Sequence, residues 1–448
     1  MKATSIEIIE ILKGAGHEAY WAGGCVRDML YGIEPQDFDI VTSARPEEIE
    51  DLLEHTIPIG KKFGVILAIQ NKHAFEIATF RSDSGYSDGR RPDAVEFTNA
   101  EQDALRRDFT INALFYDPLE DKILDFVGGQ KDMQESLLRF IGKPEERIEE
   151  DNLRLLRAVR FKNNFDLQYH PDTYQAVKKY AAYVKNVSQE RIRDELNKMI
   201  MGNNPEQAFE ELFEMDLLEQ IIPEMCKLKG LAQPKQYHNE TDVWDHSLRS
   251  LKSLTQEEVD PNPLRETPPD LALKWATLLH DIAKFETFTV KNDRITYPSH
   301  AEKGADMASA ILKRLAFPKS IIRKVDWLIR HHMMLMPLFD MPDGRRRHWF
   351  LQPHFEDLLE LYRADAMGIV PLDLSAYEKL KQMYRHEIAK LKLMPDQLIS
   401  GNEVMKILKI KPGKEVGRII KEIREKQLEG KLKTKKDAIS YIKSKLSS

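Results

Sequence analysis

The chain has 448 residues, of which 42% are hydrophobic and 31% are charged, and its formal net charge is −6. This apolar content supports packed cores in about two to four domains, and no uncharged apolar run approaches the ~18 residues that span a bilayer. The two cysteines, Cys25 and Cys226, exclude a disulfide framework and a cysteine-only zinc site. We therefore expect a cytoplasmic multidomain protein with no membrane association.

The first ~140 residues mix short β-rich runs with helical patterns, whereas almost everything after them has helical periodicity. Helices are predicted at Ser5–Lys13, Val26–Tyr31 and Pro46–His55, and strands at Ala19–Ala22, Asp37–Val41, Val65–Gln70 and Ala74–Phe80. The polar run from Arg81 to Pro92 is predicted to be a mobile loop. The pattern indicates an α/β head followed by a long helical remainder.

Two aspartates, Asp37 and Asp39, follow a Gly23-Gly24 turn in this head. Side chains alternate along a strand, so the two carboxylates are predicted to lie on one side, about 7 Å apart along the chain. Such a pair can hold Mg²⁺, and the glycine backbone together with Arg27 can accommodate phosphates. An exposed polar strand end is the alternative interpretation.

Four motifs then carry a family resemblance: GGCVRDMLYG (23–32), PQDFDIVTSARPEEI (35–49), RRDFTINALFYD (106–117) and EEDNLRLLRAVRF (149–161). They resemble the core of the class II nucleotidyltransferases, which include the tRNA CCA-adding enzymes and the bacterial poly(A) polymerases, with a polymerase β-like head. The resemblance implies that Asp37 and Asp39 bind the two catalytic Mg²⁺ ions, with Glu76 as a third carboxylate. The nucleotide-binding residues implied by it are Gly23, Gly24, Arg27, Arg107, Asp108, Asn112, Asp151, Arg154, Arg157 and Arg160.

Asp151, Arg154, Arg157 and Arg160 recur at spacings of three, which predicts one stripe of a helix. A carboxylate accepts and a guanidinium donates, so a pair of them fits the hydrogen-bonding edges of cytosine and adenine but not those of uracil and guanine. The resemblance gives this protein-template role to Glu150, Asp151 and Arg154. Exposed arginines in simple i,i+3 ion pairs are the alternative.

Two segments bear on the product. IGKKFGVILA (59–68) resembles the corresponding stretch of CCA-adding enzymes, and GYSDGRRP (85–92) resembles the flexible loop of enzymes that switch from C to A. We therefore expect addition of CCA to tRNA from CTP and ATP. An A-adding enzyme and a poly(A) polymerase remain alternatives.

A second group of metal-ligand residue types is spread over about 120 residues of helical pattern. Its members are His246, His280, Asp281, His300, either His331 or His332, and Asp365. The segments DHSLRSL, LLHDIAK and SHAEKGADMA resemble the HD superfamily of metal-dependent phosphohydrolases, although Ala283 stands where that superfamily usually has glycine. Imidazole and carboxylate donors suit Mn²⁺, Ni²⁺ or Fe²⁺ or, less distinctively, Mg²⁺. The resemblance implies a phosphatase or 2′,3′-cyclic phosphodiesterase activity, and in a further alternative this is the main activity of the protein. A purely structural metal site is the simpler interpretation.

These patterns divide the chain into a head (1–140), a helical neck and body (141–235), an HD domain (236–375) and a basic helical tail (376–448). Residues 401–448 hold 14 Lys and Arg against 6 Asp and Glu, a net charge of +8, so the rest of the chain carries −14. The tail is predicted to bind tRNA through its phosphates, with a solvated helix face as the alternative. The oligomeric state is left open.

Overall fold

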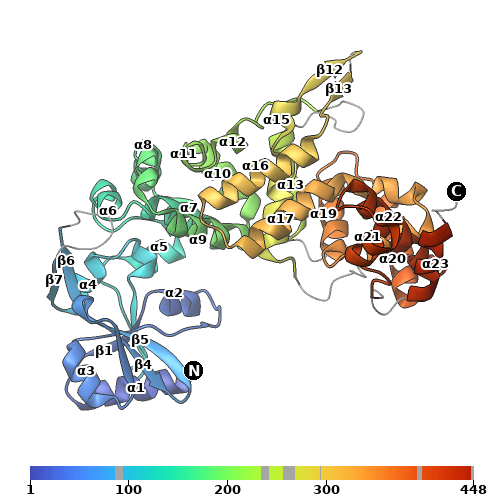
Figure 1. The fold of residues 1–448 in the computed structure, drawn as a ribbon. Helices are drawn as coiled ribbons and strands as arrows, with labels where there is room; N and C mark the ends of the chain where they lie inside the picture. Colours follow the sequence, from blue (N-terminus) through green and yellow to red (C-terminus); the bar gives the residue numbers. More distant parts are fainter. Residues whose placement is uncertain (86–93, 234–241, 256–267, 293, 391–395, 445–448) are drawn as a thin grey trace. The chain divides into compact units, whose positions relative to one another are not determined.

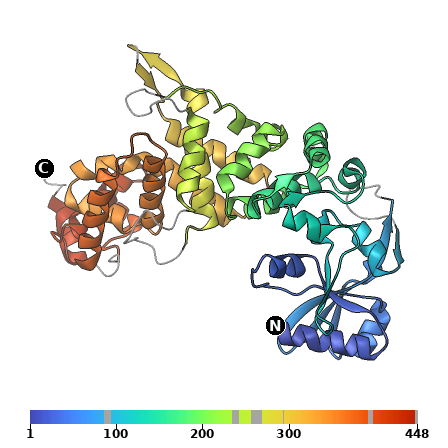
Figure 2. The ribbon, with the colours of Figure 1, turned by 180° about the vertical axis from the view of Figure 1, so that it is seen from behind.

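The computed structural model describes residues 1–85, 94–233, 242–255, 268–292, 294–390 and 396–444. The chain divides into two compact units, Met1–Pro223 and Glu224–Ser448, which Figures 1 and 2 show from opposite sides. None of the helices in the described ranges is long and apolar enough to cross a membrane.

The first unit is built on a seven-stranded mixed sheet of order β3-β4-β5-β2-β1-β8-β9. Its strands are β1 (Ala19–Ala22), β2 (Ile40–Thr42), β3 (Thr56–Gly60), β4 (Val65–Gln70), β5 (His73–Thr79), β8 (Phe115–Asp117) and β9 (Lys122–Leu124). β2 and β5 pair in parallel, and the other neighbours pair antiparallel. The predicted α/β head is confirmed.

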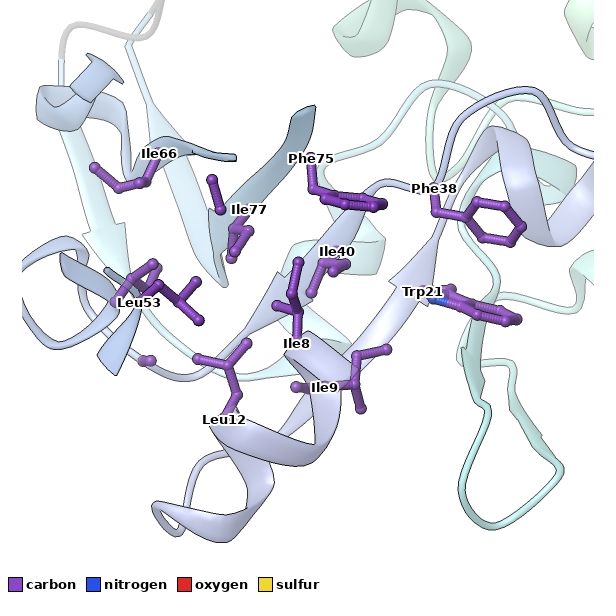
Figure 3. Packing of buried hydrophobic residues seen from close by; sticks show 14 of the residues in the cluster. Ile8, Ile9, Leu12, Trp21, Phe38, Ile40, Leu53, Ile66, Phe75 and Ile77 are labelled. Carbon is purple, nitrogen blue, oxygen red and sulfur yellow. The ribbon is translucent and has the colours of Figure 1, made fainter. Parts of the chain in front are cut away.

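Helix α1 (Lys2–Gly14) packs its apolar side against this sheet. Ile8, Ile9 and Leu12 project from α1 toward Ile40 and Ile77 on the central strands (Figure 3). All five side chains are fully buried, which makes this face the core that fixes the ends of β2 and β5. The other two predicted helices also form, as α2 (Gly24–Leu30) and α3 (Pro46–Leu52).

Two predictions about the head need correction. The predicted strand Asp37–Val41 begins only at Ile40, so both aspartates lie in the connection that leads into β2. The predicted loop from Arg81 starts instead with β6 (Arg81–Ser84), which pairs with β7 (Ala94–Phe97). A strand of four residues is too short to show a period-2 hydrophobic pattern, and its partner strand begins about ten residues later. The sequence therefore did not predict it. Residues 86–93, most of the expected mobile loop, lie outside the described ranges.

The remainder of the first unit is helical. Its helices are α4 (Ala100–Leu105), α5 (Gly129–Gln134), α6 (Pro144–Glu150), α7 (Arg154–Asn164), α8 (Pro171–Lys179), α9 (Gln189–Ile200), α10 (Pro205–Glu214) and α11 (Leu217–Ile221). Asp151 is not on the same helix as the three arginines that follow it, because α6 ends at Glu150 and Asp151 is extended, with φ −148° and ψ 103°. The predicted stripe therefore begins at Arg154.

The second unit is mostly helical, as predicted. Its longer helices are α13 (Val243–Ser253), α14 (Leu271–Leu279), α16 (His300–Arg314), α17 (Lys319–His331), α18 (Asp343–Phe350), α19 (Phe355–Met367), α20 (Ser375–Lys390), α21 (Gly401–Leu408), α22 (Lys414–Leu428) and α23 (Lys435–Ser444). A hairpin of β12 (Thr289–Lys291) and β13 (Arg294–Thr296) projects from it (Figure 1).

Candidate active site

Three carboxylates meet where β2 and β5 run side by side. The parallel register places Ile40 opposite Ile77, so Asp39 and Glu76, which precede them, are neighbours. The Asp39 carbonyl also accepts from Ala22 N at 3.0 Å, which ties this segment to β1. Asp37 and Asp39 are exposed on either side of the buried Phe38. The alternation expected for a strand thus extends into the connection before β2.

The electrostatics of this cluster favour a bound cation. Although Asp39 is exposed as a residue, the protein around it partly desolvates its carboxyl, and this desolvation, followed by the charges of Asp37 and Glu76, raises its pKa to about 6. Within the described part of the chain, no ion pair neutralises any of these three carboxylates. Hard carboxylate oxygens are the ligands that Mg²⁺ prefers, so the residues present fit the metal implied by the sequence.

The raised pKa predicts a pH-dependent Mg²⁺ affinity. Below about pH 6 a proton occupies Asp39 in the metal-free protein and competes with the cation, so the affinity should fall by about tenfold per pH unit there and level off above pH 7. Thermal unfolding in a Mg²⁺ titration at pH 5 to 8 measures it. Glu76→Gln removes one cause of the shift and should move the transition to lower pH. An affinity that is constant across this range would contradict the assignment.

The Gly-Gly turn lies beside a guanidinium group. Gly23 has φ +69°, and a Cβ on it would approach Nη1 of Arg107 to 3.0 Å, so the turn accepts only glycine without rearrangement. Arg27, on α2, donates from Nη1 to Oδ1 of Asn112 at 2.7 Å and lies over the Phe165 ring, 4.3 Å from its centroid. Two guanidinium groups therefore lie at the glycine turn, an arrangement suited to phosphates.

These groups line a pocket of about 450 Å³ in the first unit. Among the predicted residues, its lining includes Gly23, Gly24, Arg27, Asp39, Arg107, Asp108, Asn112, Asp151, Arg154 and Arg157. Four further lining residues were not predicted: Arg106, Leu153, Phe161 and Arg191. The structure thus brings Asp39, the glycine turn and two of the three predicted template residues, Asp151 and Arg154, to one cavity.

Arg160 is not among the residues that line the pocket. Its Nε donates to Glu195, which is buried, at 2.6 Å, and its guanidinium lies over Phe161. Because each helical residue turns about 100° around the axis, the Arg160 side chain points in a different direction from that of Arg157, and Glu195 on α9 binds it there. Arg160 therefore packs α7 against α9 in this structure, where the sequence predicted a nucleotide contact.

The two template residues already have protein partners. Arg191 binds both oxygens of Asp151, at 3.0 and 2.7 Å. Arg154 donates from Nη1 to Glu150 at 2.5 Å and to the Arg147 carbonyl at 2.8 Å. Both side chains are therefore held in fixed orientations at the pocket wall, which is what recognition of one base edge requires. Arg191 lies 40 residues after Asp151, and no local pattern marks it.

Asp108 is held by the next arginine of α7. Burial alone would raise the pKa of Asp108, but Arg157 and Arg154 together with the Asn112 amide lower it to about 2. Nε of Arg157 donates to its carboxylate at 2.7 Å. Asp108 is therefore ionised at neutral pH and fixes Arg157, and with it α7, against the head.

Asp103, on α4, positions two pocket arginines. Its side chain is fully buried and accepts from Nη2 of Arg106 at 2.7 Å and from Nη2 of Arg107 at 3.0 Å. Asp103→Ala leaves both guanidinium groups without this partner, and we expect it to lower the free energy of unfolding by about 3 kcal/mol. Urea unfolding beside the exposed control Glu101→Ala measures the effect, and equal midpoints would contradict this role.

The second unit gathers a separate set of metal-ligand side chains. Nε2 of His246, on α13, lies 2.9 Å from Oδ1 of Asp365, on α19, and 3.3 Å from Nε2 of His280. Nε2 of His300, at the start of α16, lies 3.2 Å from Nε2 of His332. Two triads arise, His246–His280–Asp281 and Asp281–His300–His332, and they share Asp281.

The structure shows which of the two adjacent histidines, His331 or His332, belongs to the group of metal-ligand side chains. His332 is buried and belongs to the second triad. His331, the other candidate ligand, lies instead among aromatic rings, with its ring centroid 4.8 Å from that of Trp327 and 5.1 Å from that of Trp349. Helix α17 ends at His331, and the change of backbone direction there sends the two side chains to different sides.

Three family models match the chain. Residues 19–139 match the "Poly A polymerase head domain", and residues 166–229 match the "RNA and SrmB-binding site of polymerase A". Residues 300–442 match "tRNA nucleotidyltransferase domain 2". The first match spans the acidic cluster and the glycine turn, and the third spans His300, His332 and Asp365.

Several curated relatives are CCA-adding enzymes. The one from Staphylococcus epidermidis is 40% identical over 283 residues, which are 62% of this chain and 70% of that protein. The one from Ligilactobacillus salivarius is 42% identical over 246 residues, 54% of this chain and 61% of that protein. The one from Bacillus subtilis is 36% identical over 255 residues, 57% of this chain and 61% of that protein. The matches to the latter two cover less than two thirds of each relative.

Solved structures share the fold along nearly the whole chain. The CCA-adding enzyme of Bacillus stearothermophilus in complex with CTP superimposes with a TM-score of 0.70 at 24% identity, covering 99% of this chain and 97% of that one. The Thermotoga maritima CCA-adding enzyme complexed with tRNA gives 0.58 at 19% identity, covering 98% and 94%. These likenesses concern the fold.

Proposed function

Because the chain belongs to the nucleotidyltransferase family of CCA-adding enzymes and poly(A) polymerases, we propose that it adds C, C and A to the 3′ end of tRNA. The donors are CTP and ATP, and no nucleic-acid template is needed. The observation that carries the proposal is the single pocket that contains Asp39, the Gly23-Gly24 turn, Asp151 and Arg154.

In the proposed reaction the 3′-hydroxyl of the RNA attacks the α-phosphate of the bound nucleotide, and pyrophosphate leaves. Asp37 and Asp39, with Glu76 beside them, would hold Mg²⁺, which would activate the hydroxyl and neutralise charge on the triphosphate. Arg27 and Arg107 bind the phosphates along the glycine turn. The protein groups therefore act by position and charge, and no covalent intermediate forms.

Nucleotide choice rests on Asp151 and Arg154. The carboxylate accepts from the exocyclic amino group of cytosine or adenine, while the guanidinium donates to the neighbouring ring nitrogen. Uracil and guanine each offer a carbonyl where the carboxylate needs a donor, which leaves polar groups unmatched. Arg191 and Glu150 orient this pair in the proposed mechanism.

The alternatives within the family differ in their products. An A-adding enzyme would extend only RNA that already ends in CC, and a poly(A) polymerase would extend unstructured RNA with ATP. CTP alone, supplied with a tRNA transcript that lacks CCA, distinguishes them. Two added cytidines support the proposal, whereas no addition from CTP favours one of the alternatives.

We also propose a phosphohydrolase activity for the second unit. It is favoured by the two triads that share Asp281 and by Asp365, whose Oδ1 lies 2.9 Å from Nε2 of His246. Their imidazole and carboxylate donors suit Mn²⁺, Ni²⁺ or Fe²⁺, which activate water for attack on phosphorus. The candidate substrates are a 2′,3′-cyclic phosphate, which opens to a monoester, and a phosphomonoester.

If the second unit is a phosphohydrolase, a substitution in it should abolish hydrolysis without affecting nucleotide incorporation by the first unit. Asp281→Asn removes the carboxylate common to both triads, so hydrolysis of a 2′,3′-cyclic nucleotide in the presence of Mn²⁺ or Ni²⁺ should fall at least ~100-fold. Nucleotide incorporation should stay unchanged. His331→Ala is the matched control, because this histidine lies outside both triads. Loss of folding on chelation, with no hydrolysis by the unmodified protein, would instead identify a structural metal site.

A further inference from the structure

A pocket of about 560 Å³ lies in the second unit, between α18 and α22. Trp349, Met334, Met341 and Ile420 contribute apolar surface to it, and Lys421 and Arg424 contribute charge. Its volume is in the range that small ligands occupy. None of the histidines and aspartates of the two triads lines it, so neither proposed activity accounts for it.

The positive charge in this pocket is only partly neutralised. Nε of Arg345 is paired with Glu425 at 3.0 Å. Arg424 donates to the neutral amide of Gln427 at 2.8 Å, and Lys421 is exposed and forms no ion pair with any residue in the described ranges. Two cations without an ion pair in the described part of the chain thus line the same pocket as Trp349, a combination that suits a flat group attached to an anion.

His348, which also lines the pocket, adds a hydrogen-bond donor. Burial, followed by the charges of Arg424 and Lys421, lowers its pKa and keeps the ring neutral. The Gln352 amide donates to Nε2 at 3.1 Å, so the proton is on Nδ1. Nδ1 is buried and has no hydrogen-bond partner among the described residues, so it is an unsatisfied donor in the wall of the pocket.

Gly417 keeps the wall of the pocket open. It lies inside α22, where glycine lowers helix stability relative to alanine. A Cβ at this position would meet nothing within 4 Å, so neither its neighbours nor its backbone conformation requires glycine. The free space that glycine leaves belongs to the pocket. Neither packing nor backbone conformation requires glycine here, so its effect is to leave room in the pocket, which favours binding of a ligand.

We infer that this pocket binds an unpaired base of the RNA whose 3′ end is extended. The base stacks on Trp349, and its phosphate lies against Lys421 and Arg424. A polymer is favoured over a free nucleotide because further exposed basic residues continue along the same helix: Lys414, and Arg418, which has only an exposed pairing with Glu415 at 4.0 Å. The inference rests on the proposed function for the identity of the RNA.

The test is the affinity of the full chain for a fluorescently labelled tRNA transcript that lacks CCA, measured by anisotropy at fixed salt. Trp349→Ala should raise the Kd by about tenfold, because it removes one stacked base. Trp349→Phe retains an aromatic face and should stay within about threefold of the unmodified protein. Gly417→Leu fills the pocket from the opposite wall and should match Trp349→Ala, while Gly417→Ala serves as the control and should change little.

Unfolding midpoints show whether each variant is folded. If Trp349→Ala and Gly417→Leu, which alter opposite walls of the pocket, raise the Kd equally, a local effect of losing the tryptophan is excluded. Unchanged affinity in both Trp349→Ala and Gly417→Leu would overturn the inference. Competition by millimolar AMP or CMP at this pocket would overturn the choice of RNA in favour of a free nucleotide. Nucleotide incorporation at saturating RNA is read in parallel. If the unmodified protein adds no nucleotide while RNA binding still depends on Trp349, the proposed function fails and the pocket assignment stands.

Discussion

Asp39→Asn is expected to lower the rate of nucleotide incorporation by at least ~10³-fold, and Asp37→Asn should do the same. Each removes an anionic oxygen from the cluster where the start of β2 lies against the middle of β5, which has no neutralising ion pair among the described residues. Reaction at phosphorus depends on charge stabilisation at this point, so the loss should appear mainly in kcat. Single-turnover incorporation of labelled CTP into a tRNA transcript measures it.

The controls for this experiment separate chemistry from folding. Asp51→Asn, an exposed aspartate on α3, makes the same chemical change away from the cluster and should retain full activity. Affinity for the transcript should be unchanged in all three variants, because the two aspartates act on the metal and not on the RNA body. Incorporation by Asp39→Asn at a rate within tenfold of the unmodified protein would place the chemistry elsewhere.

The second large effect is expected on the choice of nucleotide. Asp151→Asn replaces an acceptor by a group that also donates, so UTP and GTP are no longer rejected by an unmatched carboxylate. Each unmatched buried polar group costs about 1 to 3 kcal/mol, so the preference for CTP over UTP should shrink by roughly 10- to 100-fold. Ratios of kcat/KM for the four nucleotides measure the change.

Asp166→Asn is the matched control for this substitution. Asp166 is exposed just beyond the end of α7, and asparagine tolerates its positive φ of 50°. Selectivity should therefore be unaltered. Arg191→Ala gives a second readout, because it removes the group that orients Asp151 without changing the base-reading atoms. It should raise KM for CTP and ATP together. A selectivity that is unchanged in Asp151→Asn would contradict the protein-template mechanism.

Local sequence predicted those parts of the site that lie close together along the chain. The Gly23-Gly24 turn and the alternation of Asp37, Phe38 and Asp39 follow from backbone rules that act within a few residues. The neighbouring position of Glu76 needed the parallel pairing of β2 with β5, which a single sequence does not reveal. The family resemblance supplied that step.

Residues defined by tertiary packing were not predicted. Arg191 contacts Asp151 across 40 positions. The partners of Asp103, Arg106 and Arg107, are only three and four residues away, but its complete burial depends on the tertiary fold. Arg160 was expected at the nucleotide and instead binds Glu195 of α9. The end of α17 decides between His331 and His332, and a helix boundary uncertain by one residue cannot make that choice.

The central claim is tested most directly by the product formed on a tRNA transcript that ends before CCA, with CTP and ATP present together and lengths resolved to one nucleotide. The proposal predicts addition of three nucleotides in the order C, C and A, after which extension stops. An unbounded series of adenosines, or no extension until CC is supplied in the transcript, would contradict it.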